Sequence, residues 1–223
     1  MTNTNARNAA SVITALAVLV VFAFALSTAR SKARQSSVAR ATGSSDAVTY
    51  FIADGKKSTG YRPGDRELAL WALQSWERNA GKGLRFEPAG ESAALIRLYW
   101  AEPGAGEYGE TQLLLVHGKR GAAVFIRPDV EALGPNIARS AAADDLLRDT
   151  IVYLTCLHEL GHALGLAHTR DFRDIMYFFG YGGDIVQYFG RYRGQLHARN
   201  DIATVSGLSD ADVAHIRAIY ARE

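Results

Sequence analysis

HELGHALGLAH, residues 158–168, is the stretch that decides how this chain folds and what it can bind. Two histidines four positions apart, His158 and His162, lie one turn apart on the same side of an α-helix. Both imidazoles can therefore reach one metal ion, at a Zn–N distance of about 2.0–2.1 Å. Gly165 can take the left-handed conformation that ends a helix, and the turn that follows can return His168 as a third ligand. Three protein nitrogens leave a fourth position open for water, which is typical of a catalytic zinc site.

Glu159 and Met176 complete this pattern. Glu159 directly follows the first histidine, so we expect its carboxylate beside the ligands, close to a water on the metal but not bound to the metal. That position suits a general base. Met176 lies eight residues past His168, in the segment DIMY, residues 174–177. The alternative is a buried helix with core histidines, which is disfavoured because three histidines and a glutamate are costly to bury without a metal.

The pattern resembles the metzincin zinc metallopeptidases, and most closely their matrixin branch. The resemblance implies an α+β catalytic domain: a twisted, mostly parallel sheet with an antiparallel edge strand, a long active-site helix, a Met-turn at residues 174–177 and a C-terminal helix. It also implies an endopeptidase that binds a protein or peptide substrate in extended form along the edge strand. Met176 is then expected beneath the three rings without touching the metal. Astacins and serralysins fit less well, because Phe178 stands where they carry a zinc-binding tyrosine.

Charge and cysteine content exclude several other classes of protein. The chain has 223 residues and a net charge of +2. Residues 1–45 hold five basic and no acidic residues, whereas residues 46–223 hold 20 basic and 23 acidic residues, a net charge of −3. The folded part therefore shows no basic surplus for binding nucleic acid. Cys156 is the only cysteine, so we expect neither an intrachain disulfide nor a cysteine zinc site, and we predict that it is buried.

The first 45 residues predict a membrane-associated or exported protein. Residues 9–29 form an uncharged apolar run long enough to span a bilayer. The segment 1–29 that contains this run is either a retained membrane anchor or a signal peptide that is cleaved after the small residues 27–29. We favour the anchor because of its length, although the basic residues that follow the run leave the orientation open. Residues 30–45, rich in Ser, Ala and Arg, are expected to form a flexible linker. The catalytic domain is expected outside the cytoplasm, either membrane-anchored or secreted.

The catalytic domain is expected to cover residues 46–223. Runs rich in β-branched, aromatic and other apolar residues predict strands at 48–52, 84–86, 95–100, 111–116 and 122–126. Helical spacing of apolar residues, with capping residues before them, predicts helices at about 66–80, 144–165 and 208–220. The stretch 177–207 has many aromatic residues and no clear period. By the resemblance it walls the pocket for the substrate side chain after the scissile bond, and plain packing of the aromatics explains it equally well.

Two departures from the matrixin pattern change what we expect. Matrixins usually hold a structural zinc and calcium with several His and Asp residues near the edge strand, but this region has only His117. We therefore predict one catalytic zinc and neither structural ion. The family also carries an adjacent Asp pair in its final helix, one supporting the Met-turn and one receiving the freed N-terminus. Asp212 matches the first of these, and Ala211 replaces the other.

These residues predict an enzyme that cleaves peptide bonds with a zinc ion. We expect it to be a monomer and to bind no nucleic acid. The predicted zinc ligands are His158, His162 and His168, and the predicted general base is Glu159. One alternative is a membrane-tethered protein that keeps the zinc fold for binding without turnover, which the intact glutamate disfavours. Another is a zinc hydrolase that acts on a bond other than a peptide bond.

Overall fold

The computed structural model describes residues 47–104 and 108–220. The predicted anchor or signal segment at 1–29 and the predicted linker at 30–45 lie outside the described residues and stay predictions. Within the described ranges, no helix combines the length and the apolar character needed to cross a membrane.

A five-stranded sheet forms one layer of the domain, with strand order β2-β1-β3-β5-β4. Its strands are β1 (Val48–Ile52), β2 (Phe86–Pro88), β3 (Ile96–Trp100), β4 (Gly109–Val116) and β5 (Lys119–Ile126). All neighbours pair in parallel except β4, which runs antiparallel to β5 at one edge. The predicted mostly parallel sheet with an antiparallel edge strand is therefore confirmed.

Several strand boundaries differ from the prediction by one to three residues. The second strand begins at Phe86, two residues later than expected, although the Arg85 carbonyl before it already accepts a hydrogen bond from the Val48 nitrogen of β1 at 2.7 Å. The β4–β5 turn consists of His117 and Gly118 alone, both at positive φ (49° and 77°), which is the conformation that suits a two-residue hairpin. The run that was expected to separate the two strands, residues 117–121, therefore mostly belongs to β5.

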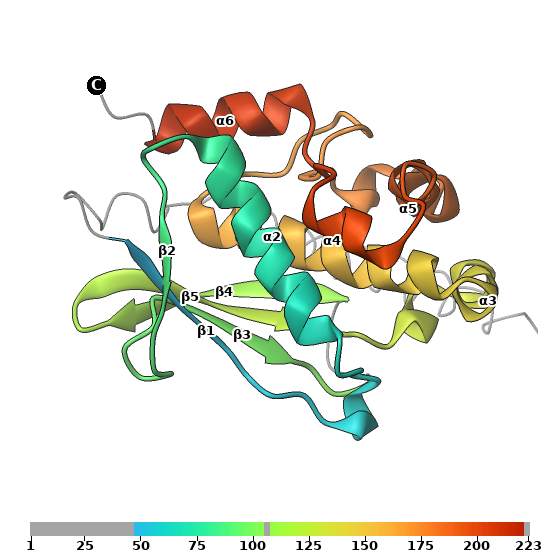
Figure 1. Ribbon diagram of the computed structural model, residues 1–223, viewed down its shortest axis with the longest axis horizontal. Coiled ribbons are helices and arrows are strands. Elements are labelled where there is room, and N and C mark those ends of the chain that lie inside the picture. The colour runs from blue at the N-terminus through green and yellow to red at the C-terminus, as the bar shows by residue number, and fades with distance from the viewer. Residues whose placement is uncertain (1–46, 105–107, 221–223) are drawn as a thin grey trace, which may run out of the picture. The chain divides into compact units, whose positions relative to one another are not determined.

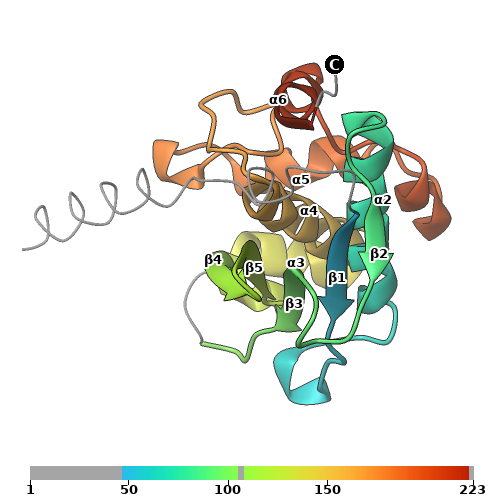
Figure 2. The same ribbon diagram turned by 90° about the vertical axis from the view of Figure 1, so that its left-hand side faces the viewer.

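Two long helices, α2 (Asp65–Ala80) and α4 (Asp145–Leu164), cover one face of this sheet (Figures 1 and 2). Trp76 of α2 is fully buried, and its indole nitrogen donates to the Leu157 carbonyl of α4 at 2.9 Å. Near the opposite end of the pair, Arg148 of α4 and Asp65 of α2 form a buried ion pair. These contacts fix the helix that carries the histidine pair against the core.

The ends of α4 are set by residues that the sequence identifies. The Asp144 side chain accepts a hydrogen bond from the Leu147 backbone nitrogen at 3.1 Å, which caps the first turn. Gly165 ends the helix in the left-handed conformation, at φ 102°, and its N–H returns to the Gly161 and His162 carbonyls. The chain can therefore reverse direction directly after the second histidine.

Three further helices complete the layer above the sheet: α3 (Pro135–Ala143), α5 (Ile185–Arg193) and α6 (Asp210–Tyr220). The first two were not predicted, and α5 packs against α4. The final helix confirms the predicted start: Ser209 and Asp212 exchange hydrogen bonds between side chain and backbone in a capping box. Helix α6 packs against α2 and lies farther from the sheet than α2 does (Figure 1).

Candidate metal centre and active site

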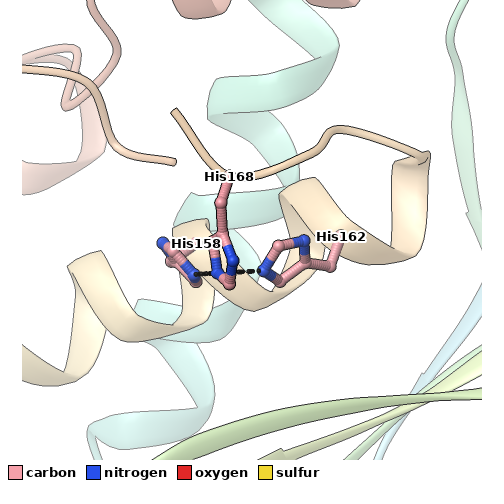
Figure 3. A group of neighbouring side chains, drawn as sticks. All are labelled: His158, His162 and His168. Carbon is pink, nitrogen blue, oxygen red and sulfur yellow. Dashed lines mark hydrogen bonds between the residues drawn. The ribbon is translucent and has the colours of Figure 1, made fainter. Parts of the chain in front are cut away.

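The three predicted ligands meet at one point (Figure 3). His158 and His162 project from α4, and His168 comes from the segment that follows Gly165. The Nε2 atom of His168 lies 3.3 Å from that of His158 and 3.0 Å from that of His162. Two nitrogens that bind one zinc ion at tetrahedral angles would lie about 3.3 Å apart, given Zn–N distances near 2.05 Å. The spacing of these atoms therefore fits a shared metal ion.

Backbone carbonyls fix which nitrogen of each helical histidine faces the centre. His158 Nδ1 lies 2.6 Å from the Ile175 carbonyl oxygen, and His162 Nδ1 lies 3.0 Å from the Leu166 carbonyl oxygen. A carbonyl only accepts, so both Nδ1 atoms carry the proton. In the neutral rings, Nε2 then presents a lone pair toward the centre, which is the arrangement that metal-binding histidines show. These carbonyl partners were not identifiable from the sequence, because the chain turn that brings Ile175 back to α4 is a tertiary feature.

The environment favours the neutral rings. Burial lowers the pKa of His158, and burial together with the neighbouring His158 lowers the pKa of His162. Burial and the two other rings lower the pKa of His168 to about 3. At neutral pH all three imidazoles are therefore neutral, which is the form that binds a metal. The donor set of three neutral imidazoles suits zinc.

The Met-turn, residues 174–177, lies against α4 and is held from two other helices. Asp212 of α6 accepts a hydrogen bond from the Ile175 backbone nitrogen at 2.8 Å, which is the support that the family resemblance implied. The Tyr188 hydroxyl of α5 lies 3.0 Å from the Asp174 carbonyl oxygen and 3.2 Å from that of Ile175. The same Ile175 carbonyl accepts from His158, so α5 and α6 both position a residue that orients a histidine of the centre.

Met176 is fully buried beneath the active-site helix. A Cβ atom added to Gly161 would overlap its Sδ atom, and would lie 3.1 Å from Cζ2 of Trp76. The helix and the Met-turn therefore touch at a place where α4 has no side chain. The role of Met176 as part of the floor of the site stays a prediction.

Glu159 is buried, with 6% of its surface exposed. One of its carboxylate oxygens, Oε2, lies 2.8 Å from the hydroxyl of Thr111 in the edge strand β4. The predicted base is thus in contact with the strand expected to bind substrate. Neither the contact nor Thr111 was predicted, because 48 residues separate the partners in the sequence.

Aromatic side chains from residue 177 onward have three kinds of surroundings. Phe178 stacks on the ring of His168, with centroids 4.7 Å apart and planes at 21°, while Phe179 and Tyr181 are exposed. The others pack in the interior, namely Tyr177, Tyr188, Phe189 and Tyr192. Most of this segment therefore packs as core, and the exposed pair stays available for the predicted pocket wall.

The family model of the matrixin peptidases matches residues 136–187. This segment contains most of α3, all of α4, the three histidines and the Met-turn. This part of the chain is therefore similar to the matrixin metallopeptidases. Within the described residues, the histidine triad is the one group of three or more His, Cys, Asp or Glu residues placed to share a metal ion.

Two solved structures of myroilysin are similar to this chain. One shares 17% sequence identity at a TM-score of 0.46, covering 80% of this chain and 94% of that one. The other shares 19% identity at a TM-score of 0.39, covering 80% of this chain and 84% of that one. No curated protein matches this chain in sequence.

Proposed function

We propose that this chain is a matrixin-type enzyme that cleaves peptide bonds within protein substrates, using one zinc ion held by His158, His162 and His168 and using Glu159 as the general base. The observation that carries the proposal is the convergence of three Nε2 atoms whose rings are oriented through Nδ1. A buried glutamate directly after the first histidine adds the proton acceptor that hydrolysis needs.

Each residue has a separate part in the reaction. A bound zinc ion would supply a Lewis acid for the scissile carbonyl and lower the pKa of the attacking water toward 7. The three histidines hold the cation and stay neutral, because burial keeps their pKa values low. The Glu159 carboxylate accepts the proton of the attacking water and then delivers it to the leaving amine. Met176 supports the floor of the site from below.

Strand β4 supports the proposed mode of substrate binding. Among the strands that the structure describes, β5 is its only neighbour, so an extended peptide could pair with the backbone groups along its other side. Two of its side chains, Leu113 and Leu115, are exposed at 43% and 78%. A substrate that adds a further strand to the sheet would cover apolar surface on a strand whose Thr111 already contacts the proposed base.

Replacing Glu159 with glutamine tests the proposal, because the amide keeps the shape of the side chain and cannot accept the proton. We expect the purified full-length variant to bind one zinc per chain, as the parent does. Its cleavage of a proteome-derived peptide mixture should fall by about 10²–10⁴-fold, the usual contribution of general acid–base catalysis. A variant that cleaves as fast as the parent would remove Glu159 from the mechanism.

The same assay separates the two alternatives. The parent enzyme is assayed with and without a chelator. If it holds zinc but cuts no peptide in either condition, the result would favour a binding protein without turnover. Products other than new peptide termini would favour a zinc hydrolase of another bond. Titration of zinc into the metal-free protein is independent of turnover, and a stoichiometry other than one would contradict the proposed centre.

A further inference from the structure

Thr111 of strand β4 contacts Glu159 at two atoms. Its Oγ1 lies 2.8 Å from the carboxylate oxygen Oε2 and 2.9 Å from the backbone carbonyl oxygen of the same residue. A threonine hydroxyl has one proton, and an ionised carboxylate and a carbonyl both only accept. Whichever oxygen receives the proton, both acceptors belong to Glu159, so the hydroxyl joins the edge strand to this residue of α4.

Gly109 makes the close approach of the strand feasible. A Cβ atom at this position would lie 2.6 Å from Oε1 of Glu159 and 2.7 Å from its Cγ. Gly109 and Thr111 are two residues apart in one strand and therefore face the same side of the sheet. Strand β4 thus leaves space for the Glu159 carboxylate at Gly109. It offers a hydrogen-bond donor to the same carboxylate at Thr111.

We infer that Thr111 is a positioning residue for the reaction: its hydroxyl holds the Glu159 carboxylate in the orientation in which it accepts the proton. The inference rests on the proposed role of Glu159 as the base. A glutamate side chain has several rotatable bonds and can adopt many rotamers. A fixed hydrogen bond to the strand selects among them, and misplacement of a reacting group by about 1 Å can cost about 10²-fold in rate.

The same contact links the base to the substrate. Strand β4 is the outer strand of the sheet, and an extended peptide paired with it would take its register from the backbone of that strand. Thr111 ties the base to the same backbone. A shift of the strand would therefore move the peptide and the carboxylate together, which keeps the distance between the scissile bond and the base constant.

Two substitutions at Thr111 test this role in the full-length enzyme. Thr111→Val keeps the branched shape and removes the hydroxyl, and we expect kcat to fall by about 10–100-fold with little change in KM or zinc content. Thr111→Ser restores the hydroxyl and should recover most of the kcat of the parent. The matched control is Thr49→Val in β1, which removes a strand hydroxyl bonded to the Ala93 carbonyl and the Leu95 nitrogen; it should cleave like the parent.

A double variant decides whether Thr111 acts through Glu159. In the Glu159→Gln background, Thr111→Val should cause no further loss of the residual cleavage, because residues that act as a unit are not additive. The inference would be overturned if Thr111→Val lowered kcat by the same factor in the Glu159→Gln background as in the parent enzyme. It would also be overturned if the Thr111→Val enzyme had the kcat of the parent. A loss of zinc or of folding that Thr111→Ser does not restore would overturn it as well. Cleavage by Glu159→Gln at the rate of the parent would instead overturn the proposed role of Glu159 as the base, whatever Thr111 does.

Discussion

Replacing Gly161 by alanine measures how closely the Met-turn is packed against the active-site helix. The added methyl group would overlap Met176 Sδ and lie 3.1 Å from Trp76 Cζ2. Both of these side chains are fully buried, and the Trp76 indole is fixed by its hydrogen bond to Leu157. Gly190 in α5 offers a matched control, because a Cβ atom there would meet nothing within 4 Å apart from its chain neighbours and the backbone of its own helix.

The expected magnitudes follow from two opposed effects. Alanine is favoured over glycine in a helix by about 1 kcal/mol, and at Gly190 nothing opposes this gain. At Gly161 the gain is offset by overpacking, which costs about 1–3 kcal/mol in a filled core. We therefore expect the Gly190→Ala protein to be more stable than the Gly161→Ala protein by about 1–3 kcal/mol. For a domain of this size that difference corresponds to about 2–4 °C in Tm for each kcal/mol.

Thermal unfolding of the zinc-loaded proteins and competition with a chelator give the two readouts. Because Ile175 next to Met176 orients His158, displacement of the turn in Gly161→Ala should also weaken zinc binding by about 10–100-fold, the usual effect of disturbing a partner of a metal ligand. Gly190→Ala should bind zinc like the parent. If both variants gain the same stability and keep the zinc affinity of the parent, the packing described between α4 and the Met-turn is wrong.

Three other perturbations have defined outcomes. Arg148→Met should lower the free energy of unfolding in urea by about 3–5 kcal/mol, because it leaves Asp65 buried without its partner; a loss below 1 kcal/mol would contradict this. Tyr188→Phe removes the donor to the Met-turn carbonyls and should cost about 0.5–1.5 kcal/mol with a measurable loss of zinc affinity, whereas unchanged affinity would separate α5 from the metal centre. The metal-free protein should lose stability as the pH falls below about 6.5, because the unfolded chain then protonates imidazoles that the fold keeps neutral, His168 down to a pKa of about 3. The slope is up to about 1.4 kcal/mol per pH unit for each such imidazole, and equal stability at pH 7 and pH 5 would refute it.

The ends of helix α4 and the positions of the three histidines could be predicted from the sequence, because both depend on interactions between residues close together in the chain. Helix α4 begins after Asp144 and ends at Gly165, as its capping residues indicate. The spacing of the histidines is helical spacing followed by a turn, so it placed the three rings correctly without any knowledge of the tertiary fold.

Helix α5 was missed although its sequence contains a signal. Asp184 caps it by accepting hydrogen bonds from the Val186 and Gln187 nitrogens, and Ile185, Tyr188 and Tyr192 recur at helical spacing. Gly190 within the helix and the surrounding glycines concealed this period. The contacts of Thr111 and Tyr188 carry no such signal, because they depend on how distant segments meet.

The dependence of the Met-turn on Asp212 has a consequence for biosynthesis. A ribosome releases the histidine-bearing helix well before it releases α6, and until then the Ile175 nitrogen lacks the acceptor that fixes its position. We therefore expect a nascent chain to pass the exit tunnel without an assembled metal site. The proposed zinc site would then reach its full affinity only after α6 has docked, which is one of the last steps in the synthesis of the described domain.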